Sequence, residues 1–397
     1  MTQTLRAPAV ETAPRREHPM ATYYLLLGST ILLLVLGLAM VLSASTIVSY
    51  NETGSAYTLW FRQVMFAVAG LVAMFMASRM SISTYRKLAY PLLIFSILAL
   101  LFVLIKGHAV AGQKNWIVLY GPFRFQPSEF AKLAFVLWAG DLMSRKQQLI
   151  HQWKHLLIPV VPVGVLMVLL VLAEGDFGTA MIIIPMIGAV LLVNGAPMRL
   201  FAVGTAAALT LVAFQSLLKG YRVDRYTAWL HPEQVAATTG FQVLHARSAM
   251  GSGGWFGMGL GASREKWVGL PEAHTDFIYA VVGEELGLFG SLLVIGLFAT
   301  IVIAGLRMAR RTTDPFVRTA SAAAVAWIFT QVFLNLGAVL QIIPITGVPL
   351  PLVSYGGSSL VPTLFVLGML MSFARAEARR PDRERPAARA SARASAR

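Results

Sequence analysis

Four carboxylates are crowded into the stretch GLPEAHTDFIYAVVGEELGLFG, residues 269–290, of a chain in which only 13% of residues are charged. Residues 286–305 carry no charge and are long enough to cross a membrane. Residues 276–285 therefore add about two to three polar turns to the outer end of a membrane helix. Glu272 precedes them and belongs to a surface loop. A carboxylate at the polar head of such a helix can act as a general base.

Asp276 is the candidate catalytic residue of this stretch. At about 100° per residue it shares a helix face with Tyr279 and Gly283, whereas Glu284 lies off that face. The residue pattern fits equally well a carboxylate that only stabilises a helix N-terminus. Glu284 and Glu285 are interpreted as structural, paired with Arg or Lys side chains on neighbouring spans.

The segment QPSEFAK, residues 126–132, holds a second pair of ionisable groups. It reads as a helix start with Ser128 as the N-cap and Glu129 in the first turn. Lys132 follows Glu129 by three residues, so the two could form a structural ion pair. The alternative is that the Lys132 ammonium faces a cavity and binds an anion, since ionisable residues at membrane depth are often functional.

Three further segments break the apolar pattern. A loop of more than 50 residues, from about 219 to 275, contains aromatic residues and a glycine run at 251–261 whose N–H groups could cradle a phosphate. Short amphipathic or re-entrant helices are expected within it. The turn LAEGDFGTAM and the uncharged segment QIIPITGVPLPLVSYGGSSLVP are the others. Irregular backbone at membrane depth is tolerated only inside protein or beside a wet cavity, so one outward-facing cavity is predicted.

The elements that must position these groups are membrane helices. Of the 397 residues, 57% are hydrophobic, which indicates an all-α polytopic membrane protein. Ten spans are predicted, at about 21–43, 59–77, 88–105, 127–143, 156–172, 177–193, 198–217, 276–306, 317–341 and 358–375. The first is interpreted as a retained span rather than a removable signal peptide.

Charge sets the expected orientation and domain organisation. Most of the 33 Lys and Arg residues fall in segments that are cytoplasmic if both termini lie inside, with the long loop between spans seven and eight outside. The net charge of +15 then reflects topology, and nucleic-acid binding is not needed to explain it. We divide the chain into a cytoplasmic tail at 1–20, a membrane domain at 21–375 and a disordered basic tail at 376–397. The absence of cysteine excludes disulfides and thiol catalysis.

Six motifs together resemble one family. VLSAS, RFQPSEFAKL, DFGTA, GFQVLHARSAMGSGGWFGMGLG, LPEAHTDFIYAVVGEELG and PLPLVSYGGSS occur in this order across the spans. The chain is identified by them as a member of the SEDS family (shape, elongation, division and sporulation) over residues 21–375. It looks more like the cell-division branch than the elongation branch. Where family members commonly carry an arginine before the tryptophan of the first outer motif, this chain has Lys114, Asn115 and Trp116.

This resemblance implies a peptidoglycan glycosyltransferase that polymerises lipid II at the outer face of the bacterial cytoplasmic membrane, at the division septum. The implied partners are a class B penicillin-binding protein and other divisome membrane proteins. The family's essential acid corresponds to Asp276. The candidates for binding the substrate's diphosphate are Lys132 with Glu129, Arg247, Arg264 and Lys266 of the long loop, and Ser358 and Ser359. No organic cofactor is expected, and the need for a divalent cation stays open.

Two other functions fit a chain of this kind. A lipid II flippase would also need polar clefts and ten or more spans, but should carry ionisable residues along a whole pathway. In this sequence the inner halves of the spans are nearly uncharged. A non-catalytic divisome scaffold would tolerate loss of the Asp276 carboxylate. An inverting transfer needs one base and positive charge for the leaving diphosphate, which favours the enzyme.

Overall fold

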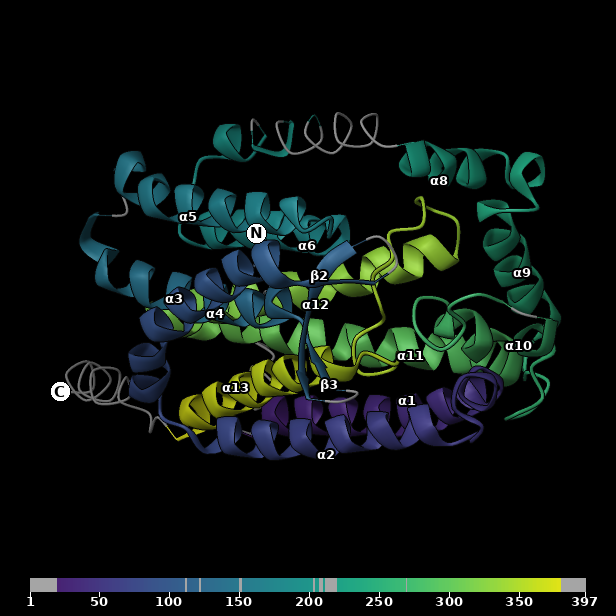
Figure 1. The fold of residues 1–397 in the computed structure, drawn as a ribbon. Coiled ribbons are helices and arrows are strands. Elements are labelled where there is room, and N and C mark those ends of the chain that lie inside the picture. Colours follow the sequence, from purple (N-terminus) through teal and green to yellow (C-terminus); the bar gives the residue numbers. More distant parts are fainter. Residues whose placement is uncertain are drawn as a thin grey trace, which may run out of the picture.

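The computed structural model describes residues 20–379 except residues 111–112, 121–122, 150–151, 203, 207–209, 211–219 and 269. Long helices running side by side make up most of the protein (Figure 1). Their bounds are α1 Ala21–Thr53, α2 Thr58–Arg79, α3 Ile82–Lys106, α4 Pro127–Arg145, α5 Trp153–Ala173, α6 Phe177–Val193, α11 Ile278–Arg311, α12 Pro315–Val339 and α13 Leu360–Ala378.

These nine helices correspond to nine of the ten predicted spans. Seven of them, within the described part of the chain, are long and apolar enough to cross a membrane: α1, α2, α3, α5, α11, α12 and α13 with its preceding turn. The shorter α6 is also apolar. Much of the predicted seventh span, 198–217, lies outside the described residues. The prediction of an all-helical polytopic membrane protein is confirmed.

Burial is uneven among the helices. α4, α12 and α13 are buried on most sides, and α4 packs against α3 and α12. In contrast, large apolar side chains are exposed along the outer faces of α1, α2, α3, α5 and α11. Exposed apolar surface on this scale is the surface that lipid covers in a membrane protein. The centre of the bundle is therefore α4, α12 and α13, with the other helices around them.

A small antiparallel sheet between α3 and α4 was not predicted. Its strands are β1 His108–Val110, β2 Gln113–Tyr120 and β3 Phe123–Phe125, in the order β1-β2-β3. Trp116 pairs with His108, and Ile117 pairs with Phe125. The Lys114 ammonium donates to the carbonyls of Leu104 and Ile105 at the end of α3, which fastens the sheet to that helix.

The long loop contains short helices, as expected. They are α8 Gly220–Leu230, α9 Thr239–Ser252 and α10 Glu265–Val268, with a 3₁₀ turn at Pro232–Val235. In Figure 1, α9 and α10 gather at one end of the bundle, beside the start of α11. Further 3₁₀ turns lie at Gln147–Leu149 and Gly357–Ser359. The end of the bundle near α9 and α10 is thus covered by folded chain.

Candidate active site

Asp276 lies just outside a helix, in the turn that leads into α11. The helix begins at Ile278 with Phe277 as its N-cap, which is two residues later than the start predicted at Asp276. Two side chains fix the turn. The Asn335 amide donates to the Asp276 carbonyl at 2.8 Å, and the Ser354 hydroxyl donates to the Thr275 carbonyl at 2.6 Å. Asp276 remains partly exposed, and these bonds fix its backbone.

The turn that contains Asp276 packs against the uncharged segment between α12 and α13, residues 340–356. The carbonyls of this segment are satisfied by buried amides: Asn335 donates to Val348, and Gln331 donates to Pro349. Gln63 of α2 donates to the carbonyl of Ser354. The backbone is also joined directly, since the N–H of Tyr355 donates to the carbonyl of His274. Neutral amides therefore hold irregular backbone in the interior, as the burial of polar groups requires.

Three influences act on the pKa of the Asp276 carboxyl. Burial and the negative charge of Glu272 raise the pKa of Asp276 to about 7, and Arg225 of α8 opposes the shift. Arg225 Nη1 also donates to the carbonyl of Ile345 at 3.2 Å. A carboxyl that titrates near neutral pH is suited to accept a proton during catalysis.

Two more arginines lie close to Tyr355, next to the same turn. Burial raises the pKa of the Tyr355 phenol, and Arg62, which hydrogen-bonds to it, and Arg124 of β3 both oppose that shift. The His274 ring lies 5.6 Å from the Tyr355 ring, between centroids. Burial lowers the pKa of His274. Arg62 and Arg124 thus bring positive charge to Tyr355, while Arg225 acts on Asp276.

Sequence reasoning missed these three arginines. They are far apart in the chain, and no local spacing relates them to Asp276. A signal was nevertheless present: each is a cation at the predicted outer end of a span or within a predicted outer segment. Grouping the outer cations by topology would have placed them with the others as candidates for binding an anion.

Lys132 and Glu129 form a buried ion pair in α4. The ammonium lies 2.8 Å from Glu129 Oε1 and 4.8 Å from the centre of the Trp327 ring. It also contacts Gln331 Oε1 at 3.4 Å, and the lysine is fully buried. The predicted N-cap was wrong: α4 begins at Pro127 with Gln126 as its N-cap, because proline is favoured at the first helical position.

The turn LAEGDFGTAM binds α4 to α6 through Asp176. Its carboxylate caps α6 by accepting from the Thr179 N–H at 2.9 Å, and it also accepts from the Gln126 amide at 2.9 Å. The neighbouring Glu174 is 2% exposed, and its carboxyl oxygens have no hydrogen-bond partner among the described residues. Burial and Asp176 raise the pKa of Glu174 to about 9, so this carboxyl is neutral at pH 7.

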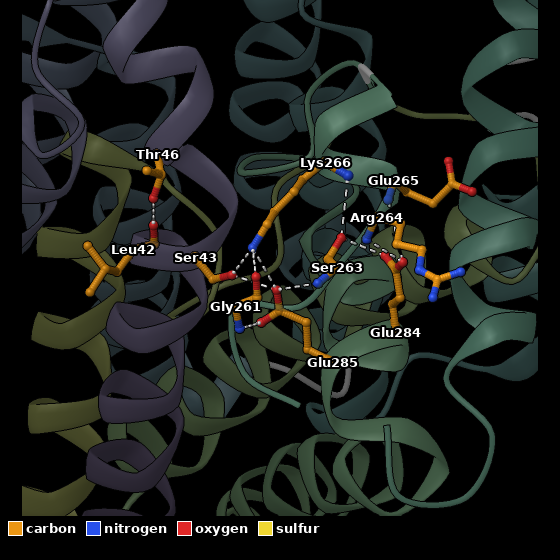
Figure 2. A network of polar contacts seen from close by, with 10 residues as sticks. All are labelled: Leu42, Ser43, Thr46, Gly261, Ser263, Arg264, Glu265, Lys266, Glu284 and Glu285. Carbon is orange, nitrogen blue, oxygen red and sulfur yellow. Dashed lines mark hydrogen bonds and ion pairs between the residues drawn. The ribbon is translucent and has the colours of Figure 1, made fainter. Parts of the chain in front are cut away.

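Glu284 binds the long loop rather than a cation on a neighbouring span, which corrects the sequence interpretation, and Glu285 binds both the loop and Ser43 of α1. Figure 2 shows both carboxylates facing the loop 261–266. Glu284 accepts from the Arg264 N–H at 2.7 Å and from the Ser263 hydroxyl at 2.6 Å. Glu285 pairs with Lys266 at 3.2 Å. Backbone donors of a glycine-rich loop thus replace the expected cation for Glu284, since the loop folds onto the head of α11.

Lys266 joins three elements through this network. Its ammonium contacts Glu285, the Ser43 hydroxyl of α1 at 2.9 Å and the carbonyl of Gly261 at 2.6 Å (Figure 2). Ser43 belongs to the VLSAS motif, and its hydroxyl also donates to Glu285 at 2.5 Å. In this arrangement the Lys266 charge is already neutralised by Glu285, whereas the Arg264 side chain is exposed.

α11 is broken at Gly287, and the glycine run packs into the break. Gly287 has φ 68° and ψ −161°, which are not helical angles. The N–H groups of Met258 and Gly259 donate to the carbonyls of Glu284 and Glu285, while the N–H of Leu288 donates to Gly254. These donors are used within the protein, so they do not form the expected phosphate cradle. Next to the break is an open hollow of ≈ 300 Å³, lined by Met250, Gly251, Gly254, Trp255, Gly283, Gly287, Leu288 and Ser291.

A side chain at position 287 is expected to destabilise the protein. A Cβ there would lie 2.3 Å from the Gly257 nitrogen, and the positive φ adds strain. Gly287→Ala should lower the free energy of unfolding by about 2 kcal/mol or more, seen as a lower melting temperature of the purified protein. Gly296→Ala is the matched control, because nothing lies within 4 Å of a Cβ at that position in the same helix. Equal melting temperatures for the two variants would contradict this account.

The remaining candidate residues for substrate binding are Arg247, Ser358 and Ser359. Arg247 is exposed and lines an open hollow of ≈ 330 Å³ with Met250, Val339, Leu340 and Gln341. Ser358 is buried, and its hydroxyl has no hydrogen-bond partner among the described residues. The Ser359 hydroxyl donates to the carbonyl of Gly356 at 3.0 Å.

The arrangement combines one accessible base with nearby positive charge. The pKa of Asp276 is raised to about 7, Arg225 acts on its carboxyl, and Arg62 and Arg124 act on Tyr355, whose N–H binds the His274 carbonyl. A base and a set of fixed cations can deprotonate a hydroxyl and stabilise an anionic leaving group. In the part of the chain that the structure describes, His, Asp and Glu side chains form no group of three that could hold a metal ion.

Comparisons with known proteins agree with the fold and the motifs. A family model described as cell cycle protein, covering FtsW, RodA and SpoVE, matches residues 23–379. The probable peptidoglycan glycosyltransferase FtsW of Mycobacterium tuberculosis is 38% identical over 362 residues, covering 91% of this chain and 69% of that protein. Stage V sporulation protein E of Bacillus subtilis is 35% identical over 357 residues, covering 88% and 96%.

Solved structures give the same result. A chain from a peptidoglycan synthase complex, described as coordinating polymerization and crosslinking, has a TM-score of 0.72 and 28% identity. The rod shape determining protein RodA of Thermus thermophilus has a TM-score of 0.65 and 28% identity. Each comparison covers 89% of this chain and 97% of the other. The likeness therefore extends over nearly the whole membrane domain.

Proposed function

Since this chain belongs to the FtsW, RodA and SpoVE family of cell cycle proteins, we propose that it polymerises lipid II at the outer face of the cytoplasmic membrane. It is a multi-pass membrane enzyme, a peptidoglycan glycosyltransferase, and it acts in cell wall synthesis during division. The relatives favour the FtsW branch, in agreement with the sequence motifs. The finer proposals concern the catalytic residue, the septal location and the partner.

Asp276 is the general base of the proposed reaction. Its carboxylate takes the proton from the acceptor sugar hydroxyl, and the hydroxyl oxygen forms the new bond to the anomeric carbon of the donor. The bond from that carbon to the diphosphate breaks, and the diphosphate leaves with the electron pair. The observation that carries this proposal is a partly exposed Asp276 whose pKa is raised to about 7 and on which Arg225 acts. No general acid is required, because a diphosphate leaves without protonation.

Arg62 and Arg124 are the best placed cations for the departing diphosphate. Both act on Tyr355, whose N–H binds the His274 carbonyl two residues before Asp276. Bidentate guanidinium groups suit phosphate oxygens. Arg247 and Arg264, which are exposed, remain proposed contacts for more distant parts of the substrate, as do Ser358 and Ser359. Titration with Mg²⁺ and Mn²⁺ tests whether a divalent cation shares the charge.

Lys132, Glu129 and Lys266 are proposed to support the site indirectly. The charge of Lys132 is balanced by Glu129, and that of Lys266 by Glu285. Moving either lysine onto a diphosphate would leave a buried carboxylate unpaired, which is costly. A direct role in diphosphate binding, as the sequence suggested, therefore requires a rearrangement of these pairs when substrate binds.

A class B penicillin-binding protein is the proposed partner, with other divisome membrane proteins, at the division septum. One structural neighbour comes from a complex described as coordinating polymerization and crosslinking. A transpeptidase next to the polymerase would receive new glycan strands as they form. The exposed apolar faces of the outer helices provide surface on which a membrane anchor could pack.

Polymerisation of labelled lipid II by the purified chain tests the function directly. We expect glycan strands, with a higher rate when a candidate class B penicillin-binding protein is added. In liposomes, a flippase would instead move lipid II across the bilayer without lengthening it, and a scaffold would do neither. Translocation without polymer, with or without the partner, would overturn the proposal in favour of the flippase.

A further inference from the structure

Arg225 and Asp276 flank the same small space, although 50 residues of chain separate them. The space lies over Gly347, which has φ +73°. A Cβ built on Gly347 would lie 3.7 Å from Arg225 Nη1 and 3.7 Å from Asp276 Oδ2. Any side chain at position 347 would place its Cβ in contact with both the Arg225 guanidinium and the Asp276 carboxylate, so glycine keeps the space between them empty.

Both groups are anchored by neutral partners. Arg225 Nη1 donates to the carbonyl of Ile345, two residues before Gly347. Asn335 binds the carbonyls of Asp276 and Val348 at 2.8 Å each, which fixes the Asp276 backbone relative to the residue after Gly347. One short turn of chain, residues 345–348, therefore sets the distance between Arg225 and Asp276.

The charged groups that act on the Asp276 carboxyl are few. Glu272, in its own turn, raises its pKa, and Arg225 of α8 lowers it. His274 lies two residues away, and burial favours its neutral form. The residues that pack against the turn from α12 and from residues 347–354, namely Asn335, Gly347, Val348 and Ser354, carry no charge. Arg225 is thus the cation that offsets burial at Asp276.

We propose that Arg225 is a positioning residue of the active site: anchored on the Ile345 carbonyl, its guanidinium holds the Asp276 carboxylate ionised and in place across the Gly347 turn. This inference rests on the proposed role of Asp276 as the base. Arg225 forms no bond to the reacting atoms and acts through Asp276. An opposite charge close to a carboxyl lowers its pKa by about one unit or more.

Arg225→Gln is therefore expected to move the acidic limb of the pH profile for lipid II polymerisation up by about one pH unit. The base must be deprotonated to act, and without the cation it is deprotonated only at higher pH. Arg225→Lys keeps the charge, so the limb should stay closer to that of the wild type while the rate falls. Arg310→Gln, an exposed arginine at the far end of α11, is the control and should leave the limb unchanged.

A second measurement reads protonation without activity. Dicyclohexylcarbodiimide reacts with protonated carboxyls, and mass spectrometry can follow its attachment to Asp276 as pH is varied. The pH at half-maximal labelling should rise by about one unit in Arg225→Gln. If that variant does not fold, Arg225→Met is the second neutral replacement for the same measurement.

The outcomes separate this inference from the proposed function. A slower Arg225→Gln variant with the wild-type acidic limb and labelling curve would mean that Arg225 is only structural, and the inference would be wrong. If Asp276→Asn polymerises lipid II normally, the role of Asp276 fails and that of Arg225 fails with it. An inactive Asp276→Asn together with an unshifted Arg225→Gln would overturn only the inference about Arg225.

Discussion

Asp276→Asn should lower the rate of lipid II polymerisation by about 100-fold or more, because general bases contribute about 10²–10⁴ to a rate. Asparagine has nearly the same shape but cannot accept the proton. The measurement is glycan strand formation by the purified protein across a range of pH. In the wild type the rate should increase as pH rises through about 7, the pKa of Asp276.

The same variant should fold as well as the wild type. For a carboxyl whose pKa is raised from 3.8 to about 7 on folding, stability is greatest below pH 3.8 and is lost as pH rises through 7. A neutral asparagine avoids this loss, so the melting temperature at pH 8 should not fall. Glu272→Gln, in the same turn, is the matched control and should retain most of its activity. A well-folded Asp276→Asn protein that polymerises normally would remove Asp276 from the mechanism.

Lys132→Met should cost about 3–5 kcal/mol in the free energy of unfolding, the usual effect of removing one partner of a buried ion pair. Glu129 is left as an unpaired carboxylate among the side chains of α4 and α12. The melting temperature of the purified protein measures this loss. The double variant Glu129→Gln with Lys132→Met should recover much of it, because no buried charge remains.

Lys87→Met is the control for this pair, since Lys87 is exposed. Its melting temperature should match that of the wild type. If Lys132→Met keeps its melting temperature but loses polymerisation, the structural interpretation is wrong, and Lys132 acts on the substrate as the sequence first suggested.

The helices were predictable because a long apolar run in lipid must satisfy its backbone hydrogen bonds within itself, which a helix does. α4 was predicted correctly despite Glu129 and Lys132, since the two charges neutralise each other inside the bundle. The sheet β1–β3 was not predicted, because two of its strands have three residues and depend on pairing rather than on pattern. The break at Gly287 was also missed, since glycine is common inside membrane helices and need not interrupt them.

Sequence motifs could suggest single candidate residues of the site, but not the contacts between distant segments. The choice of Asp276 rested on the family resemblance, because its place at the head of α11 fits a capping carboxylate equally well, and its role as the base stays a prediction. The partners of Glu284 and Glu285 could not be predicted, because the loop 261–266 reaches them only after it folds back onto α11. Arg225 of α8 acts on Asp276, and Arg62 of α2 and Arg124 of β3 act on Tyr355, so these relations exist only in the tertiary structure.

The break at Gly287 separates the head of α11, which follows Asp276, from the long apolar part of the helix. An unbroken helix of 34 residues would be about 51 Å long and would carry any change in tilt directly to Asp276. Below the break, residues 288–311 measure about 36 Å, enough to cross a hydrocarbon layer of about 30 Å. The head, residues 278–286, is fixed to the loop instead. Membranes of different thickness can thus change the angle of the lower part while the distances around Asp276 stay the same.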